Sequence, residues 1–223
     1  MSNELWSAVD AYYADLLVRP DEALEAALAA SEAAGLPTIA VAPNVGKLLN
    51  LMARAMGARR ILEIGTLGGY STIWLARALP ADGRMMTLDF DPKPTEVARG
   101  NIERAGLGAL VEQREGPALD TLAQLVEAGE APFDFIFIDA DKESYTEYLD
   151  WSLKLSRPGT MIVADNVVRA GKISDAASSD PLVQGIRRFN QALAAESRIS
   201  ATAIQTVGVK GHDGLTIALV VGD

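Results

Sequence analysis

The sequence contains no cysteine and a single histidine, His212. The absence of cysteine excludes disulfide bonds, thiolate nucleophiles and cysteine-based zinc or iron–sulfur sites. His212 falls in a glycine-rich stretch that we expect to be a surface hairpin loop, and no serine is marked as its activated partner. A catalytic site built on sulfur or on a serine–histidine pair is therefore not predicted.

Basic residues are also scarce, since 20 lysines and arginines face 30 aspartates and glutamates, for a formal net charge of −10. Nucleic-acid binding needs a basic face to neutralise phosphates. An anionic membrane surface attracts basic segments for the same reason. We therefore expect neither nucleic acid nor a membrane surface as a partner.

Long apolar runs are missing as well. No stretch of 18 apolar residues occurs, and residues 1–6 lack the basic and apolar regions of a signal peptide. The composition, with 49% hydrophobic and 22% charged residues, is ordinary for a globular protein. The 223 residues are enough for one sizeable domain. We expect a cytoplasmic enzyme.

The middle of the chain alternates between two patterns. Short apolar runs predict buried strands, and between them apolar residues at helical spacing predict helices. Strand–helix alternation is typical of an α/β fold with a parallel sheet covered on both faces. The predicted strands are 59–64, 84–90, 110–115, 133–138 and 159–164, and the predicted helices are 70–79, 92–105, 118–128, 143–155 and 181–196.

The two ends of the chain differ from this middle. Helical patterns at 4–17, 21–34 and 43–56 predict a helical N-terminal extension over residues 1–57, ahead of an α/β core over 58–223. Two β-rich runs, 200–207 and 214–221, predict a hairpin with a longer glycine-rich loop. This hairpin would add antiparallel strands to one edge of the sheet.

Two polar clusters follow consecutive predicted strands. Asp139, Asp141 and Lys142 come after one strand, and Asp165 with Asn166 after the next. Ligands of open parallel sheets bind outside the carboxyl ends of the strands. Two carboxylates and an amide oxygen at one edge suit a hard divalent cation such as Mg²⁺. The plainer interpretation is helix caps and solvated charges.

Lys142 has a possible catalytic role in this arrangement. A divalent cation nearby would disfavour the ammonium form of the lysine. Lys142 would then be a proton acceptor near neutral pH. Its alternative is a solvated charge at the start of a helix.

A glycine-rich turn joins the first strand to its helix, in Glu63-Ile64-Gly65-Thr66-Leu67-Gly68-Gly69-Tyr70-Ser71. Glycine allows close approach of a ligand to the backbone, and the helix start offers free N–H groups. The spacing is not the G-x-G-x-x-G of dinucleotide sites, which disfavours a nicotinamide-dependent reductase. Asp89 ends the next strand, where a carboxylate accepts ribose hydroxyls. A tight turn without a ligand and a solvated strand end are the alternatives, and Asp91 could cap the following helix.

Taken together, three motifs resemble the cation-dependent small-molecule O-methyltransferases, which include catechol O-methyltransferase, the plant caffeoyl-CoA O-methyltransferases and bacterial relatives. The motifs are Leu62–Ser71, Phe137–Lys142 and Ala164–Val167, and the similarity runs from Ala42 to Leu215. The bacterial branch is the most similar. The resemblance implies a Rossmann-like class I methyltransferase fold, with seven mostly parallel strands and an antiparallel last strand.

The resemblance also implies roles for individual residues. S-adenosylmethionine would be the methyl donor, and Mg²⁺, Mn²⁺ or Ca²⁺ the metal. Lys142 would be the base, and Asp139 would lie beside both the metal and the cofactor. The implied cofactor-binding residues are Val45, Glu63, Gly65, Thr66, Ser71, Asp89, Ala118 and Asp139, and the implied metal ligands are Asp139, Asp165 and Asn166.

The implied activity is transfer of a methyl group to one hydroxyl of a catechol-like, vicinal dihydroxy compound. The N-terminal helices would cover the site and form a homodimer. The animal catechol enzyme has a histidine and a tryptophan where this chain has Ala140 and Asp141, which implies a more open pocket. The loop 167–180, with Arg169 and Lys172, would form part of a lid.

Two other functions stay open on the residues alone. One is a methyltransferase of the same fold that acts on another acceptor, such as RNA or protein, without metal. The other is a cofactor-binding module that has lost catalysis. The acidic balance and the metal-type cluster disfavour the first, and the presence of every expected site residue disfavours the second.

Overall fold

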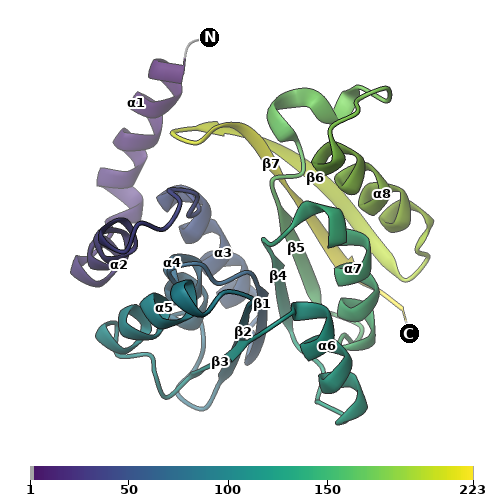
Figure 1. Ribbon diagram of the computed structural model, residues 1–223, viewed down its shortest axis with the longest axis horizontal. Coiled ribbons are helices and arrows are strands. Elements are labelled where there is room, and N and C mark those ends of the chain that lie inside the picture. Colours follow the sequence, from purple (N-terminus) through teal and green to yellow (C-terminus); the bar gives the residue numbers. More distant parts are fainter. Residues whose placement is uncertain (1–2, 223) are drawn as a thin grey trace.

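A seven-stranded mixed sheet forms the centre of the computed structural model, which describes residues 3–222 (Figure 1). The strand order is β3-β2-β1-β4-β5-β7-β6. Strands β1 to β5 pair in parallel, whereas β7 pairs antiparallel with both β5 and β6. The predicted α/β fold class is confirmed. The strands are β1 Arg60–Ile64, β2 Arg84–Asp89, β3 Val111–Glu115, β4 Phe135–Ile138, β5 Met161–Asp165, β6 Ile199–Gly208 and β7 Gly211–Val220.

Helices cover both faces of the sheet (Figure 1). Each helix of the core follows a strand, as the alternating pattern predicts. Asp21, Asp91 and Asp180 cap the helices that follow them by accepting backbone N–H groups. The α-helices are α1 Asn3–Tyr13, α2 Glu22–Ala33, α3 Pro43–Ala55, α4 Tyr70–Ala76, α5 Pro92–Arg104, α6 Ala118–Glu127, α7 Tyr145–Lys154 and α8 Pro181–Ala195, and the other helical segments are η1 Ala14–Val18, η2 Lys142–Ser144 and η3 Arg169–Ser174.

The core has two layers because successive strand residues point to opposite faces. On β4, Phe135 and Phe137 pack in the cluster shared with α3, α4 and α5. Ile136 and Ile138 pack in the cluster shared with α6, α7 and α8. All four side chains are fully buried. Burial on both faces explains why this strand reads as a continuous apolar run in the sequence.

Three segment predictions differ from the structure. The β6–β7 connection is short, because the pairing continues to Gly208 opposite Gly211, and His212 lies on β7 rather than in a loop. The helix expected over 143–155 begins as the short segment η2 before α7. Part of the loop 167–180 is the helical segment η3. Among the residues described, no helix is long and apolar enough to cross a membrane.

Candidate functional site

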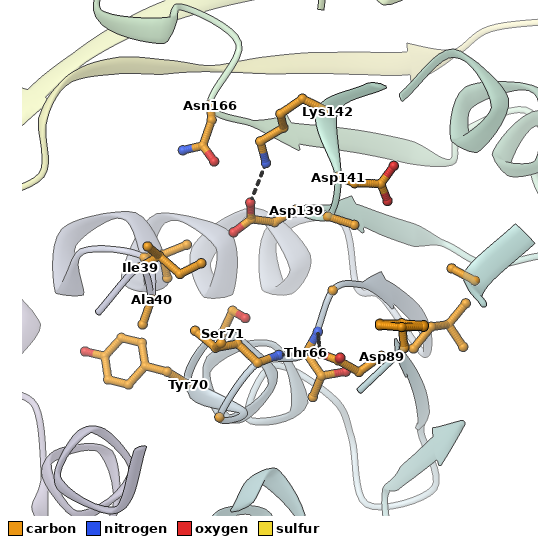
Figure 2. A pocket seen from close by; sticks show the side chains of 18 of the residues that line it. Ile39, Ala40, Thr66, Tyr70, Ser71, Asp89, Asp139, Asp141, Lys142 and Asn166 are labelled. Carbon is orange, nitrogen blue, oxygen red and sulfur yellow. Dashed lines mark hydrogen bonds and ion pairs between the residues drawn. The ribbon is translucent and has the colours of Figure 1, made fainter. Parts of the chain in front are cut away.

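A cavity of about 760 Å³ opens at the carboxyl ends of β1, β2, β4 and β5 (Figure 2). Residues 39–41, from the segment before α3, also line the cavity. The parallel strands bring side chains that are distant in sequence to this one edge. The predicted site residues that line the cavity are Gly65, Thr66, Ser71, Asp89, Ala118, Asp139, Lys142 and Asn166.

Three predicted residues do not line it directly. Glu63 is completely buried behind Ser71. Asp165 ends β5 immediately before Asn166. Val45 lies on α3 and packs against the core cluster that includes α4. Their roles toward a cofactor or metal stay predictions.

The turn after β1 requires glycine at its first position. Gly65 has φ +101°, and a Cβ atom there would lie 2.1 Å from the carbonyl oxygen of Asp139. The β1 and β4 ends are therefore in direct backbone contact, which leaves no room for a side chain between them. This close approach places the glycine turn next to the acidic cluster.

Asp89 holds the same turn from the side of β2. Its Oδ2 accepts hydrogen bonds from the backbone N–H groups of Thr66, at 3.1 Å, and Leu67, at 2.8 Å. Oδ1 accepts one from Asp91 at 3.1 Å. Asp89 therefore shapes the turn, and its role as a ribose acceptor stays a prediction.

Glu63 is a fully buried carboxyl group surrounded by hydroxyls. It accepts hydrogen bonds from Ser71, at 2.6 Å, from Thr87, at 2.7 Å, and from Thr72. Burial raises the pKa of Glu63 to about 7, and the charge of Asp139 adds to the rise, while the three hydroxyls oppose it. A cationic group in the adjoining cavity would favour the ionised form of this carboxyl.

Lys142 reaches into the cavity from η2, and its side chain is only 9% exposed. Its Nζ donates to Oδ1 of Asp139 at 2.9 Å and to the hydroxyl of Tyr145 at 2.7 Å (Figure 2 shows the first bond). The ammonium group therefore stands at the rim of the acidic cluster. Its role as a proton acceptor stays a prediction.

Tyr145 is a site residue that we did not predict from the sequence. It is fully buried, and its hydroxyl donates a hydrogen bond that is shared between the backbone carbonyl oxygens of Ile138, at 3.2 Å, and Asp165, at 3.0 Å. The tyrosine thus joins Lys142 to the ends of β4 and β5. Burial raises its pKa well above the ordinary value, and the charges of Asp139 and Asp165 add to the effect. The only sequence signal was its spacing three residues after Lys142, which puts both on one side of a helical turn.

Asp139, Asp165 and Asn166 form the candidate metal site. Burial and the charge of Asp139 raise the pKa of Asp165 to about 7, so the two carboxylates lack full compensation by positive charge. Residues 3–222 contain no cluster of three or more acidic or histidine side chains suited to a metal. The candidate set instead combines two carboxylates with one amide. Such hard oxygen donors, with a deficit of positive charge, fit a divalent cation.

Gly185 on α8 lies against the backbone of Lys142. A Cβ atom at Gly185 would lie 2.3 Å from the Lys142 carbonyl oxygen. We expect Gly185→Ala to lower the free energy of unfolding by about 1–3 kcal/mol through overpacking. The same clash should displace Lys142 from its position in the cavity, and kcat should fall as a result. Urea unfolding followed by circular dichroism, and steady-state kinetics, measure the two effects.

Gly100→Ala is the matched control, because Gly100 is an exposed position inside α5 where an added Cβ meets nothing. This control should gain about 0.5–1 kcal/mol from reduced chain entropy. Equal stability of the two alanine variants would show that α8 does not constrain Lys142.

Comparison with known proteins identifies the family to which this chain belongs. The model of the O-methyltransferase family matches residues 19–221. This chain belongs to the O-methyltransferase family. The enzyme is 56% identical over 220 residues to a catechol O-methyltransferase of Niastella koreensis, covering 99% of this chain and all of the relative. It is 54% identical to a catechol O-methyltransferase of Mycobacterium tuberculosis, covering 95% and 94% of the two chains.

Solved structures give the same result for this O-methyltransferase. The Bacillus cereus O-methyltransferase in complex with SAH superposes with a TM-score of 0.97 at 56% identity, covering 98% of this chain and all of the other. An O-methyltransferase of Streptomyces achromogenes in complex with SAM has a TM-score of 0.96 at 53% identity, with full coverage of both chains. The enzyme is therefore an S-adenosylmethionine-dependent O-methyltransferase with the Rossmann-like fold predicted from its motifs.

Proposed function

We propose that this O-methyltransferase depends on a divalent cation and methylates one hydroxyl of a catechol-like small molecule. The observation that carries the proposal is the convergence of Lys142 with Asp139 and Asn166 on the cavity that the glycine turn also lines. The residues proposed to bind the cofactor and those proposed to bind the metal then line the same cavity, where a methyl donor and a dihydroxy acceptor could meet.

The cation would be held by Asp139, Asp165 and Asn166. When bound, a divalent cation lowers the pKa of a coordinated hydroxyl and fixes the orientation of two adjacent oxygens. Mg²⁺ is the proposed metal, and Mn²⁺ and Ca²⁺ share its preference for oxygen ligands.

The chain itself would position and deprotonate the acceptor. Lys142 in its neutral form would receive the proton of the reacting hydroxyl and become an ammonium group. Asp139 together with the Tyr145 hydroxyl would hold the lysine nitrogen in place. Ser71, Glu63 and the glycine turn would hold the methyl donor on the opposite side. Much of the rate would come from this orientation of donor and acceptor.

The acceptor class is supported by two relatives named catechol O-methyltransferase. Ala140 and Asp141, together with Tyr148, line the cavity on the side of β4 and α7. The Tyr148 hydroxyl donates to Asp141, which keeps this carboxylate turned toward α7. The small side chain of Ala140 leaves space for acceptors that are bulkier than a simple catechol.

Methyl transfer from labelled S-adenosylmethionine to 3,4-dihydroxycinnamate tests the proposal. We expect turnover with Mg²⁺, its loss in excess EDTA, and its return when Mg²⁺ is restored, because the acceptor hydroxyl needs the cation to ionise. Turnover that persists in EDTA after dialysis would contradict the metal assignment. No turnover of any catechol, with the methyl donor bound, would contradict the acceptor class.

The homodimer and the cytoplasmic location also stay predictions. Support for the homodimer comes from α1 and η1, which expose a row of large apolar side chains. These are Leu5, Val9, Tyr12, Tyr13, Leu16 and Leu17. An apolar row of this kind is a common feature of surfaces that associate.

A further inference from the structure

A second cavity, of about 500 Å³, lies next to the first and shares one residue, Arg169, with it. Residues at the start of α1, in the segment η3 and at the β6–β7 turn line it. None of the roles assigned above to the metal, the methyl donor or the base uses this space. Its lining residues are Asn3, Trp6, Arg169, Ala170, Lys172, Asp180, Lys210, Gly211, His212 and Asp213.

Basic side chains outnumber acidic ones in this cavity by three to two, although the chain carries a net charge of −10. The cations are Arg169, Lys172 and Lys210, and two carboxylates accompany them. Asp180 lies 3.7 Å from Lys172 and forms an ion pair with it. Lys210 donates to the backbone carbonyl of Thr38 at 2.9 Å, which leaves its charge without an acidic partner among the described residues.

Asp213, the second carboxylate, is used to hold the backbone around Arg169. Its Oδ1 accepts hydrogen bonds from the N–H groups of Val168, Arg169 and Gly214, each at 3.0 Å. These bonds coincide with an unusual conformation, since Arg169 has φ +53° and Ala170 has φ +56°. Two neighbouring non-glycine residues in the left-handed region are costly and persist only where the surroundings hold them. The hydrogen bonds of Asp213 therefore fix the backbone from which the Arg169 side chain extends.

The guanidinium of Arg169 has no acidic partner within the described part of the chain. Its Nε is buried and has no hydrogen-bond acceptor. A buried donor without an acceptor is expensive, and a ligand that supplies the acceptor removes the cost. Because the guanidinium offers parallel N–H groups in a fixed plane, it matches an anion with paired oxygens, a carboxylate or a phosphate, and the carboxylate shares its planar shape.

We infer that Arg169 binds a carboxylate on the methyl acceptor, and that the second cavity receives this substituent. The inference rests on the proposed function and narrows its substrate class to catechols with an acidic side chain, such as 3,4-dihydroxycinnamate. Asn166 and Arg169 line the same cavity, three residues apart in the chain. An acceptor with its two hydroxyls at Asn166 and Lys142 therefore has Arg169, the residue that also lines the second cavity, within the same pocket.

The first experiment compares kcat/KM for 3,4-dihydroxycinnamate and for its neutral methyl ester. We expect the wild type to prefer the acid, and Arg169→Met to reduce the acid-to-ester ratio by about 10-fold to 100-fold, the usual effect of a charge-assisted hydrogen bond. The change should lie mainly in KM. Arg169→Lys should keep part of the preference, since it retains the charge but not the planar fork.

Arg99→Met is the matched control, because Arg99 is exposed on α5 and its one acidic partner among residues 3–222 is Glu96. Its acid-to-ester ratio should equal that of the wild type. An unchanged ratio in Arg169→Met, or an equal fall in Arg99→Met, would overturn the inference.

Direct binding of cinnamate separates this inference from the proposed function. Cinnamate carries the carboxylate but no hydroxyl, so it offers no hydroxyl to methylate, and calorimetry in excess EDTA measures its Kd without turnover and without a cation that its carboxylate could bind. We expect at least 10-fold weaker binding to Arg169→Met and to Arg169→Gln, and no change for Arg99→Met. Wild-type turnover of the neutral ester reports on the proposed function alone. Equal cinnamate affinity in the wild type and both Arg169 variants would overturn the carboxylate site even if the ester is methylated.

Discussion

Replacement of Lys142 by methionine is expected to lower kcat by about 100-fold to 10,000-fold, the contribution of a positioned general base. Methionine keeps most of the volume of the lysine side chain but accepts no proton. The contacts from Nζ to Asp139 and to the Tyr145 hydroxyl are lost together with the charge. The KM of the methyl donor should change little, because Lys142 is assigned to the acceptor side.

Steady-state kinetics at saturating S-adenosylmethionine measures this effect. Lys154→Met is the matched control, since Lys154 is exposed at the end of α7 and lies over the ring of Trp151. The control should keep wild-type kcat. A Lys142→Met enzyme with kcat within threefold of the wild type would show that the acceptor loses its proton by another route.

Replacement of Asp165 by asparagine is expected to weaken divalent-cation binding by at least about 100-fold. Asparagine preserves the shape but removes one of the two negative charges, and attraction between a cation and a buried charge is strong where water is excluded. Isothermal calorimetry with Mg²⁺ or Mn²⁺ measures the change. Asp150→Asn, an exposed position on α7, should bind the metal like the wild type.

The same site predicts a pH dependence. Because the pKa of Asp165 is raised to about 7, a proton competes with the cation below that pH. The Kd for the cation should therefore rise about tenfold for each unit that the pH falls below 7, and level off above it. Asp165→Asn should lack this break. A wild-type Kd that is constant between pH 5.5 and 8 would contradict the assignment of Asp165 as a ligand.

Much of the fold follows from local pattern. The buried strands β4 and β5 are visible as apolar runs because both faces of the sheet are covered, and each run ends at a polar cluster. The clusters around Asp139 and Asp165 could be predicted to meet, since parallel neighbouring strands end at the same edge. The order β5-β7-β6 at the edge follows from long-range pairing, which no local pattern contains.

The features of the site and fold that could not be predicted from the sequence depend on contacts between distant segments. Tyr145 reads as one more apolar helix residue, and only the folded chain shows its hydroxyl between the ends of β4 and β5. Asp213 reads as a loop acid, although it organises the backbone of Arg169. The glycines near His212 suggested a loop, whereas strand pairing continues through Gly208 and Gly211. Pairing across the hairpin outweighed the low strand propensity of glycine there.

Asn166 is subject to two independent demands, because it is a proposed ligand and also has φ +59°. Asparagine and aspartate tolerate this left-handed conformation better than other residues with a Cβ, and glycine tolerates it best. Glycine would preserve the turn and delete the oxygen, while most other residues would lose both. Aspartate is therefore the one substitution that keeps both the left-handed backbone conformation and a side-chain oxygen. This substitution adds a negative charge to the site. A related enzyme with a different metal preference could therefore arise by substitution at this one residue, with the backbone of the loop unchanged.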